Sequence, residues 1–584
     1  MFKKISFIRD AWRIAKPYWQ SEEKFSAWVL LISVVALNLF LVYLLVLFNE
    51  WYRLFYDALQ NLDKEAFFYQ IIRFCILAFI NIMTFVLEYY LQYLLMIRWR
   101  RWLTAKYVKW WLTDKAYYKM QLFRDGTDNP DQRISQDLNE FVLYTFNLGI
   151  GLMTQVITLV SFAVVLWGIS GILVIPIFGG ISIQGYMMWA AIFYAIFGTY
   201  MTLRIGFPLI GLDFNQEKLE ANFRYSLVRL RENTEGIALY GGEASEELKF
   251  GYIFRDVVTN LRAIMKRSVY LGCWTNFYNQ LARIFPALVA APRVFAKEIL
   301  LGGMMQIVQA FGHVHDSLSF IVDTYPNIAK WRAVIQRLQG FNEDIERMQD
   351  LTSKLPHSLF LCEEKGGKGI RLDNVDVDLP GEKPLLPRVN LLLKKGVSVL
   401  VSGPSGAGKS TFLRVLAGIW PFGTGKVYMP TGDTTMFLPQ KPYLPIGTLR
   451  ATLVYPQQET SLLSEDILKA VIRDCGLEQF EEHLDDNRDW TKTLSLGEQQ
   501  RVAMARAILL EPDWLFLDEA TSALDEPSEK TLYTLLKDRL PKTTLISVGH
   551  RSTIRAFHES NLVFQPTGEG HFSLQYVEKS DEAI

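Results

Sequence analysis

The chain has 584 residues, several times the ~100–200 residues of a typical domain, so we expect at least two domains. Half of its residues are hydrophobic, 14% are aromatic and only 21% are charged, which excludes an intrinsically disordered chain. Basic and acidic residues are equal at 61 each, so the charge gives no sign of a nucleic-acid partner.

The first part of the chain is the more apolar part, and it predicts a membrane domain at residues 1–340. Six apolar stretches are each long enough to cross a hydrocarbon core about 30 Å thick as a helix. The mixed polar and apolar segment before the first stretch is typical of a helix that lies along the membrane interface. The six stretches lie near residues 26–48, 71–97, 143–167, 186–205, 270–295 and 303–323.

Basic residues orient these stretches. They cluster after the second stretch, between the fourth and the fifth, and after the sixth, whereas the loop 168–184 has almost none. By the positive-inside rule, both termini and the two long loops are expected in the cytoplasm. Because loops of about 45 and 65 residues are too long to lack structure, we expect the membrane helices to continue into the cytosol. The turn-rich segment 125–133 is the expected tip of the first loop.

The composition changes at residues 341–369, a charged stretch with adjacent glycines that we interpret as a linker. From residue 370 to residue 584, short β-rich runs alternate with helical ones. Continuous apolar runs before turns, such as 397–401 and 514–517, are typical of a buried parallel sheet. The predicted fold class is therefore an α-helical membrane domain followed by an α/β domain.

A glycine-rich loop lies between the apolar run 397–401 and a predicted helix, which is the setting of a phosphate-binding P-loop. Glycines let backbone N–H groups turn toward phosphates, and the helix N-terminus adds positive potential. Lys409 is expected to reach the β- and γ-phosphates, and Ser410 is expected to ligate Mg²⁺, so ATP and Mg²⁺ are the predicted cofactors. The loop consists of Gly403, Pro404, Ser405, Gly406, Ala407, Gly408, Lys409, Ser410 and Thr411.

A second apolar run ends in the acid pair Asp518 and Glu519. Ligands bind at the carboxyl ends of strands in open α/β sheets, so Asp518 is expected to hold the Mg²⁺ shell. Glu519 is then the candidate that orients or deprotonates the attacking water. The alternative is that the acid pair only caps the next helix. His550, after the strand-like run 543–548, is a candidate contact to the γ-phosphate, although such a histidine alone is unremarkable.

In this order and spacing, these motifs resemble the ATP-binding cassette (ABC) family over residues 370–584. The resemblance implies two roles for Gln440, which lies in the segment called the Q-loop. It joins Glu519 and His550 as a catalytic residue, and it joins Ser410 and Asp518 as a ligand of Mg²⁺. It also implies a homodimer, in which the signature segment of one chain closes over ATP bound to the other. Six membrane stretches before one cassette look like a half-transporter of the exporter-type fold. The signature residues are Ser495, Gly497 and Glu498.

A narrower resemblance is carried by the segments 129–134, 223–243, 403–425 and 436–450. They look like the branch that joins peroxisomal acyl-CoA half-transporters (subfamily D) to bacterial fused transporters of the BacA/SbmA group. The last residues do not match a peroxisomal targeting signal, which favours the bacterial side. The resemblance then implies uptake of vitamin B12-like compounds or modified peptides across a bacterial inner membrane. The alternatives are a lipid or acyl-CoA transporter, and a membrane-tethered regulatory ATPase that transports nothing.

Two residues depart from the family pattern. Leu496 replaces a glycine of the signature, so its side chain is expected to approach the opposing nucleotide or the partner cassette. Leu379 stands where an aromatic residue usually stacks on adenine. Loss of such a ring costs roughly 1 kcal/mol, by analogy with base–aromatic contacts.

Polar residues recur at helical spacing in the last two apolar stretches. Ionisable residues inside membrane spans are costly and usually face a cavity, so we predict that these residues line a water-filled substrate cavity. The alternative is that they lie in helix extensions or bridge neighbouring helices. The residues are Asn276, Gln280 and Arg283 in the fifth stretch and Gln306, Gln309, His313 and Asp316 in the sixth.

Overall fold

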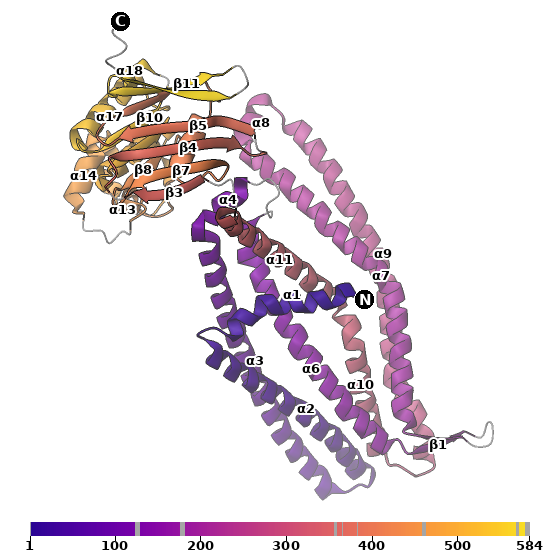
Figure 1. The fold of residues 1–584 in the computed structure, drawn as a ribbon. Helices are drawn as coiled ribbons and strands as arrows, with labels where there is room; N and C mark the ends of the chain where they lie inside the picture. The colour runs from indigo at the N-terminus through magenta and orange to yellow at the C-terminus, as the bar shows by residue number, and fades with distance from the viewer. Residues whose placement is uncertain are drawn as a thin grey trace. The chain divides into compact units, whose positions relative to one another are not determined.

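A computed structural model gives the fold of the chain (Figure 1). It describes residues 2–122, 129–175, 181–354, 359–364, 366–381, 383–457, 463–549, 551–567 and 571–578. The chain divides into two compact units, Met1–Lys109 with Asn129–Asn342 and Trp110–Asp128 with Glu343–Ile584. We call them the membrane unit and the cassette unit.

Long helices make up most of the membrane unit (Figure 1). All six predicted membrane stretches are helical, in α2, α3, α6, α7, α9 and α10. The helices are α1 Phe2–Trp19, α2 Lys24–Gln60, α3 Lys64–Leu112, α5 Pro130–Gln132, the π-helical turn η2 Arg133–Asp137, α6 Leu138–Ile169, α7 Tyr186–Glu232, α8 Thr234–Tyr240, α9 Glu243–Phe295, α10 Leu301–Asp323 and α11 Tyr325–Lys354. Helices α3 and α11 continue into the cassette unit.

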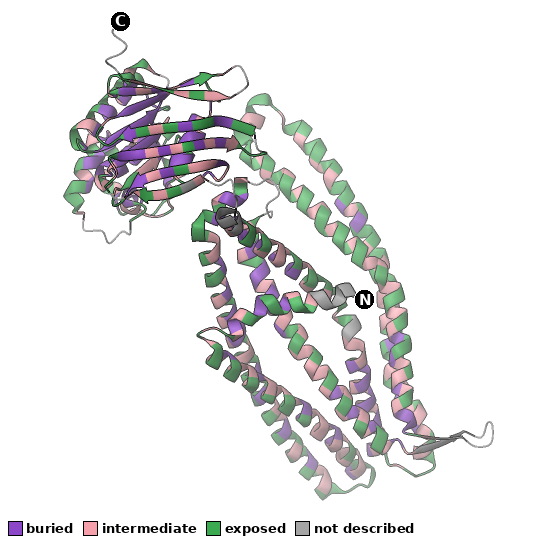
Figure 2. Cartoon of the chain, viewed as in Figure 1, coloured by how far each residue is buried: buried purple, intermediate pink, exposed green. Residues whose placement is uncertain are grey.

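Within the described residues, four helices are long and apolar enough to cross a membrane: α2, α3, α6 and α7. Helices α9 and α10 are long enough but not apolar enough, because polar residues such as Arg283 and Asp316 interrupt their apolar stretches. Much of the membrane unit is exposed along its helices in the isolated chain, as Figure 2 shows. Large apolar side chains are among these exposed residues, and in water such surfaces would be unfavourable.

The predicted extensions of the membrane helices are present. Helix α7 continues to Glu232, and α9 begins at Glu243, with the short helix α8 between them as the tip of the second loop. Of the predicted first tip, only residues 129–133 lie within the described part of the chain. There Asn129 has a left-handed backbone (φ 55°) directly before Pro130, the first residue of α5.

The loop 168–184 contains a hairpin that the sequence did not predict. Strand β1 (Ile172–Ile175) pairs antiparallel with β2 (Ile181–Gln184). Beside it, Arg293 of α9 donates from Nη1 to the carbonyl oxygens of Ile169 and Ser170, both at 2.8 Å. A cation at the C-terminus of a helix satisfies its free carbonyls and interacts favourably with its dipole. Arg293 therefore secures the end of α6.

The cassette unit contains two sheets (Figure 1). A six-stranded sheet has the order β12-β11-β6-β10-β9-β8, and a four-stranded sheet has the order β3-β7-β4-β5. The strands from β11 to β8 in the first sheet are parallel, and β12 is antiparallel to β11. The strands are β3 Leu359–Glu364, β4 Gly369–Leu379, β5 Lys383–Lys394, β6 Val399–Ser402, β7 Gly423–Pro430, β8 Thr435–Leu438, β9 Trp514–Asp518, β10 Thr544–Val548, β11 Ser560–Pro566 and β12 Phe572–Glu578.

Two apolar cores hold the cassette unit together, one on each face of the six-stranded sheet. Trp514 and Phe516 of β9 belong to the core shared with the four-stranded sheet, whereas Leu515 and Leu517 belong to the core beneath the helices. This alternation follows from the two-residue period of a strand. The helices are η1 Thr113–Lys115, α4 Ala116–Leu122, α12 Lys409–Leu416, α13 Leu449–Val454, α14 Glu465–Asp474, η3 Glu478–His483, α15 Trp490–Thr493, α16 Leu496–Leu510, α17 Glu526–Arg539 and α18 Ser552–Arg555.

Secondary structure extends into the stretch 341–369 that we interpreted as a linker. Helix α11 continues to Lys354, and β3 pairs in parallel with β7 from Leu359 onward. The segment 110–122 of the first loop belongs to the cassette unit. Its Lys115 Nζ donates to the carbonyl oxygen of Ala417 at 3.3 Å, and Leu122 packs against the core shared by the two sheets. The end of α3 is therefore attached to the cassette.

Candidate functional site

The predicted P-loop connects β6 to α12. Its Gly403, Gly406 and Gly408 have φ angles of 144°, 78° and 90°, a backbone region that disfavours other residues. A side chain at position 408 would also clash, because a Cβ on Gly408 would lie 2.5 Å from Cδ2 of Leu385. The loop therefore needs glycine at these positions in order to begin α12 at Lys409.

Lys409 lies over this loop. Its Nζ donates to the carbonyl oxygens of Gly403 and Pro404 at 2.9 and 2.8 Å. Burial lowers the pKa of Lys409, while the carboxylates of Glu519 and Asp518 raise it. The loop N–H groups, the start of α12 and this ammonium provide the positive surroundings that a polyphosphate requires. The residues present therefore fit a nucleotide.

Ser410, in the first turn of α12, meets Asp518, the last residue of β9. Ser410 Oγ donates to Asp518 Oδ1 at 2.8 Å. Burial raises the pKa of Asp518, and the hydrogen bond from Ser410 opposes that shift. Hydroxyl and carboxylate oxygens are the ligands that Mg²⁺ prefers, together with phosphate oxygens and water. The pair therefore fits the predicted magnesium site.

Glu519 has a left-handed backbone, with φ at 49°. A non-glycine residue in this conformation costs about 1–3 kcal/mol, and such strain concentrates at functional sites. The N–H of Glu519 donates to the carbonyl oxygen of Val548 at 3.2 Å, which ties the turn to the neighbouring strand. The helix that follows, α17, has Asp525 as its N-cap. The acid pair therefore does not cap that helix, and the alternative reading of it is wrong.

The signature residues form the start of α16. Ser495 is the N-cap, and its Oγ accepts from the N–H of Glu498 at 3.3 Å. The Glu498 carboxylate accepts in return from the Ser495 N–H at 2.8 Å, which completes a capping box. Leu496, the first residue of the helix, is 43% exposed. Its approach to a second cassette stays a prediction.

The remaining predicted residues of the cassette are Gln440, Leu379 and His550. Gln440 is exposed, and its carbonyl oxygen accepts from Nε2 of Gln500 at 2.9 Å. Leu379 is the last residue of β4 and is 36% exposed. His550 lies outside the described residues, so its contact to the γ-phosphate stays a prediction.

The polar residues of the last two membrane stretches fall into two groups. Asn276, Gln280 and Arg283 of α9, together with Asp316 of α10, are exposed in the isolated chain, and Gln309 is half-buried. Gln306 and His313 of α10 instead pack against other helices. Gln306 is buried, and its backbone carbonyl oxygen accepts from Nδ2 of Asn49 of α2 at 3.0 Å, while the His313 ring stacks on Phe162 of α6 at 4.2 Å. The cavity stays a prediction for the exposed group, whereas Gln306 and His313 lie against neighbouring helices.

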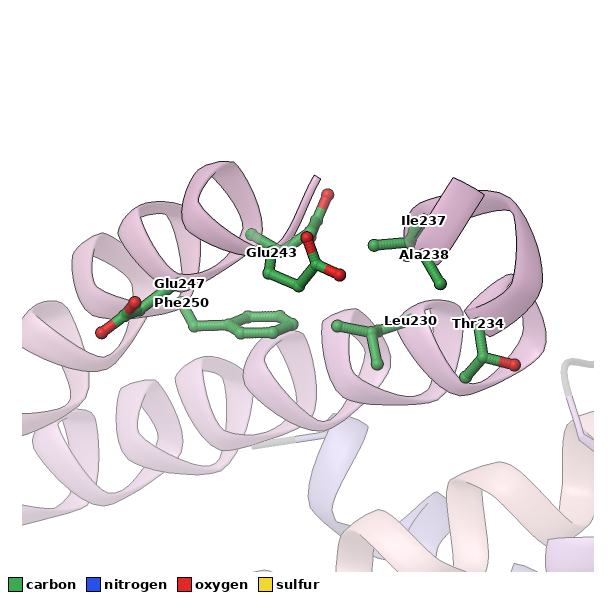
Figure 3. A pocket seen from close by; sticks show the side chains of 8 residues that line it. Leu230, Thr234, Ile237, Ala238, Glu243, Glu247 and Phe250 are labelled. Carbon is green, nitrogen blue, oxygen red and sulfur yellow. The ribbon is translucent and has the colours of Figure 1, made fainter. Parts of the chain in front are cut away.

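A pocket of about 380 Å³ lies at the tip of the second loop. Figure 3 shows the side chains of Leu230, Ile237 and Phe250, from α7, α8 and α9, turned toward a common space. Glu243, at the start of α9, lies at its edge. The sequence predicted a turn at this tip but not the pocket.

Sequence reasoning missed two further residues beside the nucleotide site. Gln500 stands within the signature motif, and Arg551 directly follows His550, so both were visible as neighbours of predicted residues. Arg551 Nη1 donates to the carbonyl oxygen of Leu524 at 2.7 Å. Their roles depend on loops that are distant in the sequence, which no local pattern indicates.

Comparison with known proteins relates both units to one family. A model described as "ABC transporter transmembrane region 2" matches residues 14–295, and one described as "ABC transporter" matches residues 386–522. An uncharacterized ABC transporter ATP-binding protein of Haemophilus influenzae is 36% identical over 96% of this chain and 93% of its own length. The lysosomal cobalamin transporter ABCD4 of Homo sapiens is 29% identical over 98% of this chain and 97% of its own. The structure of a bacterial Atm1-family ABC exporter with ATP bound has the same fold, with a TM-score of 0.70 over 95% of both chains at 18% identity.

The placement of Glu519 predicts that Glu519→Gln lowers the steady-state rate of ATP hydrolysis by about 100-fold or more, because general-base catalysis is lost. ATP binding is expected to remain. Glu511→Gln is a matched control, since Glu511 also has a left-handed backbone (φ 43°) but lies at the end of α16. Normal turnover in Glu519→Gln would show that another group activates the water.

Lys409→Ala is expected to weaken ATP binding about tenfold or more, because a charge-assisted contact to the phosphates is lost. Equilibrium binding of a fluorescent ATP analogue measures the effect. Lys530→Ala, an exposed lysine of α17, serves as the control. An unchanged affinity in Lys409→Ala would contradict the assigned role of the P-loop.

Proposed function

This chain belongs to the ABC transporter family, and on that premise we propose that two copies form a homodimer that carries a hydrophilic solute into a bacterial cell. The family and the fold are as predicted: a helical membrane domain of the exporter type is followed by a nucleotide-binding domain, and the chain is homologous to the subfamily D protein ABCD4. The chain is thus an ATP-driven transporter. Its substrate, its direction and its homodimer are the proposal.

The contact between Ser410 and Asp518 carries the ATPase part of the proposal. Mg²⁺ bound with ATP would neutralise charge on the phosphates, and Ser410, Asp518 and Gln440 are the residues that would hold it. Lys409 and the P-loop N–H groups would bind and orient the phosphates. Glu519 would take a proton from the attacking water, with His550 beside the γ-phosphate.

Exposed surfaces on the chain support the homodimer. The side chain of Ser495, at the signature start, bonds to Glu498 of its own chain, and the neighbouring Leu496 is 43% exposed. At the second tip, Leu239 and Tyr240 of α8 are 80% and 91% exposed. Exposed apolar groups of this kind are favourable only when another surface covers them. A second copy supplies such a surface and completes each ATP site.

The exposed polar residues of α9 and α10 support a hydrophilic substrate. A lipid tail would gain nothing from Arg283 or Asp316, whereas a polar solute would replace the water that both side chains need. The human relative, which matches almost the whole chain, is named as a cobalamin transporter. We therefore propose vitamin B12-like compounds as the first substrate class to test, with modified or antimicrobial peptides as the second.

The distribution of basic residues supports an orientation with both termini and the cassette in the cytoplasm. The related protein of Haemophilus influenzae supports a bacterial source, for which the inner membrane is the expected location. ATP hydrolysis would then occur on the cytosolic side. Transport requires that the ATP-bound and ATP-free states expose the substrate to different sides of the membrane.

Release of cyanocobalamin and of short modified peptides from preloaded proteoliposomes tests the substrate. Vesicles with the cassette outward are expected to show ATP-dependent transport out of the lumen, since inward transport in the cell moves solute toward the cassette side. Vesicles that contain Glu519→Gln are the matched control. Competition by an acyl-CoA would favour the lipid alternative, and ATPase activity without transport of any solute would favour the regulatory ATPase.

Cysteine scanning tests the cavity. Cysteines at Asn276, Gln280 and Arg283 are expected to react with a membrane-impermeant thiol reagent in at least one nucleotide state. Leu281, an exposed apolar neighbour on α9 that lies away from the polar stripe, is the control that the surrounding lipid should protect. The native Cys75 and Cys273 are exposed and must first be replaced. If the polar positions resist the reagent in every nucleotide state, the cavity prediction fails.

A further inference from the structure

The side chain of Gln500 joins two loops of the nucleotide site. Gln500 lies in α16 and is 0% exposed. Its Nε2 donates to the carbonyl oxygen of Gln440 at 2.9 Å and lies 3.4 Å from Ser522 Oγ. Its Oε1 accepts from the N–H of Ala523 at 3.1 Å. One planar amide thus connects the Q-loop at Gln440 to a second loop, at Ser522 and Ala523 just after Glu519. We call this second loop the D-loop.

We propose that Gln500 is a positioning residue that makes the Q-loop and the D-loop move together during the ATP cycle. This inference rests on the proposed function, because both loops act on bound nucleotide. A buried amide that loses one partner leaves a polar group unsatisfied, which is costly. A displacement of either loop therefore strains its hydrogen bond to Gln500 and favours a matching displacement of the other loop.

Neighbouring contacts hold the two ends of this connection. On the Q-loop side, Arg506 of α16 donates to the carbonyl oxygens of Tyr443 and Thr452, at 3.2 and 2.7 Å, so the segment after Gln440 is bound to the same helix. On the D-loop side, Arg551 donates to the Leu524 carbonyl oxygen at 2.7 Å. Among the contacts of Gln500, Arg506 and Arg551 with described residues, only those of Gln500 reach from the Q-loop to the D-loop.

The adjacent glutamine provides a matched control. Gln499 is 5% exposed, and its Nε2 donates to the carbonyl oxygens of Thr491 and Leu494 at 3.0 and 2.9 Å. Both partners lie in the segment that leads into α16. Gln499 therefore stabilises the start of the helix through buried hydrogen bonds without contacting either loop through them.

The kinetic test compares Gln500→Met with Gln499→Met in the full-length protein. Methionine has a similar length and removes the amide, so both variants lose buried hydrogen bonds and both are expected to lower the Tm. In Gln500→Met, kcat for ATP hydrolysis is expected to fall about tenfold while KM for ATP stays within about twofold. In Gln499→Met, kcat is expected to change less than about threefold. Equal kcat values in the two variants would overturn the proposal.

A second measurement follows the loops directly, without turnover. Hydrogen exchange of residues 437–444 and 519–526 is measured as ATP is added to the Glu519→Gln protein. Both segments are expected to become protected from exchange at the same ATP concentration. In the double variant that also has Gln500→Met, the ATP concentrations at half-maximal protection are expected to differ between the two segments by about threefold or more. Gln499→Met should leave the midpoints together. Coincident midpoints in the Gln500→Met protein would also overturn the coupling.

A third variant separates the two halves of the connection, and its Tm shows whether it is folded. Gln500→Glu keeps the oxygen that accepts from Ala523 and removes the N–H that donates to Gln440, so it should lower kcat as Gln500→Met does. A protein that hydrolyses ATP normally with Gln500→Glu would contradict the Q-loop half of the proposal. Failure of the wild-type protein to hydrolyse ATP would instead refute the proposed function itself.

Discussion

The nucleotide site depends on the register of three neighbouring parallel strands. β6, β10 and β9 pair so that Val401, Val548 and Asp518 lie in one row across the sheet. At the end of this row the chain leaves each strand toward the same edge, because the carboxyl ends of parallel strands meet there. Ser410 and Asp518 therefore come within hydrogen-bond distance although 108 residues separate them in the sequence.

Apolar packing maintains this register. Trp514 and Phe516 are buried on one face of the sheet, and Leu515 and Leu517 on the other. A slip of one residue would exchange the two sets of side chains and would misplace Asp518 at the same time. The placement of Asp518 is thus a consequence of the core, and the strained backbone of Glu519 is held by its hydrogen bond to Val548 of the fully buried strand β10.

The phosphate site was predictable from the sequence because its chemistry restricts residue types at fixed positions. Gly408 must adopt φ 90°, Lys409 must carry the ammonium, and an apolar strand must precede Asp518. Membrane stretches were predictable because a bilayer requires long apolar helices. Neither inference needs knowledge of what lies nearby in space.

Other features were not predictable because they depend on contacts between distant segments. The hairpin in 168–184 lies in an apolar loop where strand pairing leaves no sequence signal. β3 falls in a charged stretch, and its pairing depends on β7, far along the chain. The attachment of the first loop to the cassette depends on Lys115 and Leu122 meeting the region around α12. Gln500 likewise acquires its role only when two loops reach it.

The N-termini of helices α12 and α16 differ in how favourable their charge is for an anion. Helix α12 begins at Lys409 with no acidic residue in its first turn, so its N–H groups and the ammonium add to one another. Helix α16 begins with a capping box in which Ser495 and Glu498 satisfy each other, and the carboxylate offsets the positive end of the helix. Of the two helix starts, α12 therefore offers an anion the more favourable surroundings within this chain.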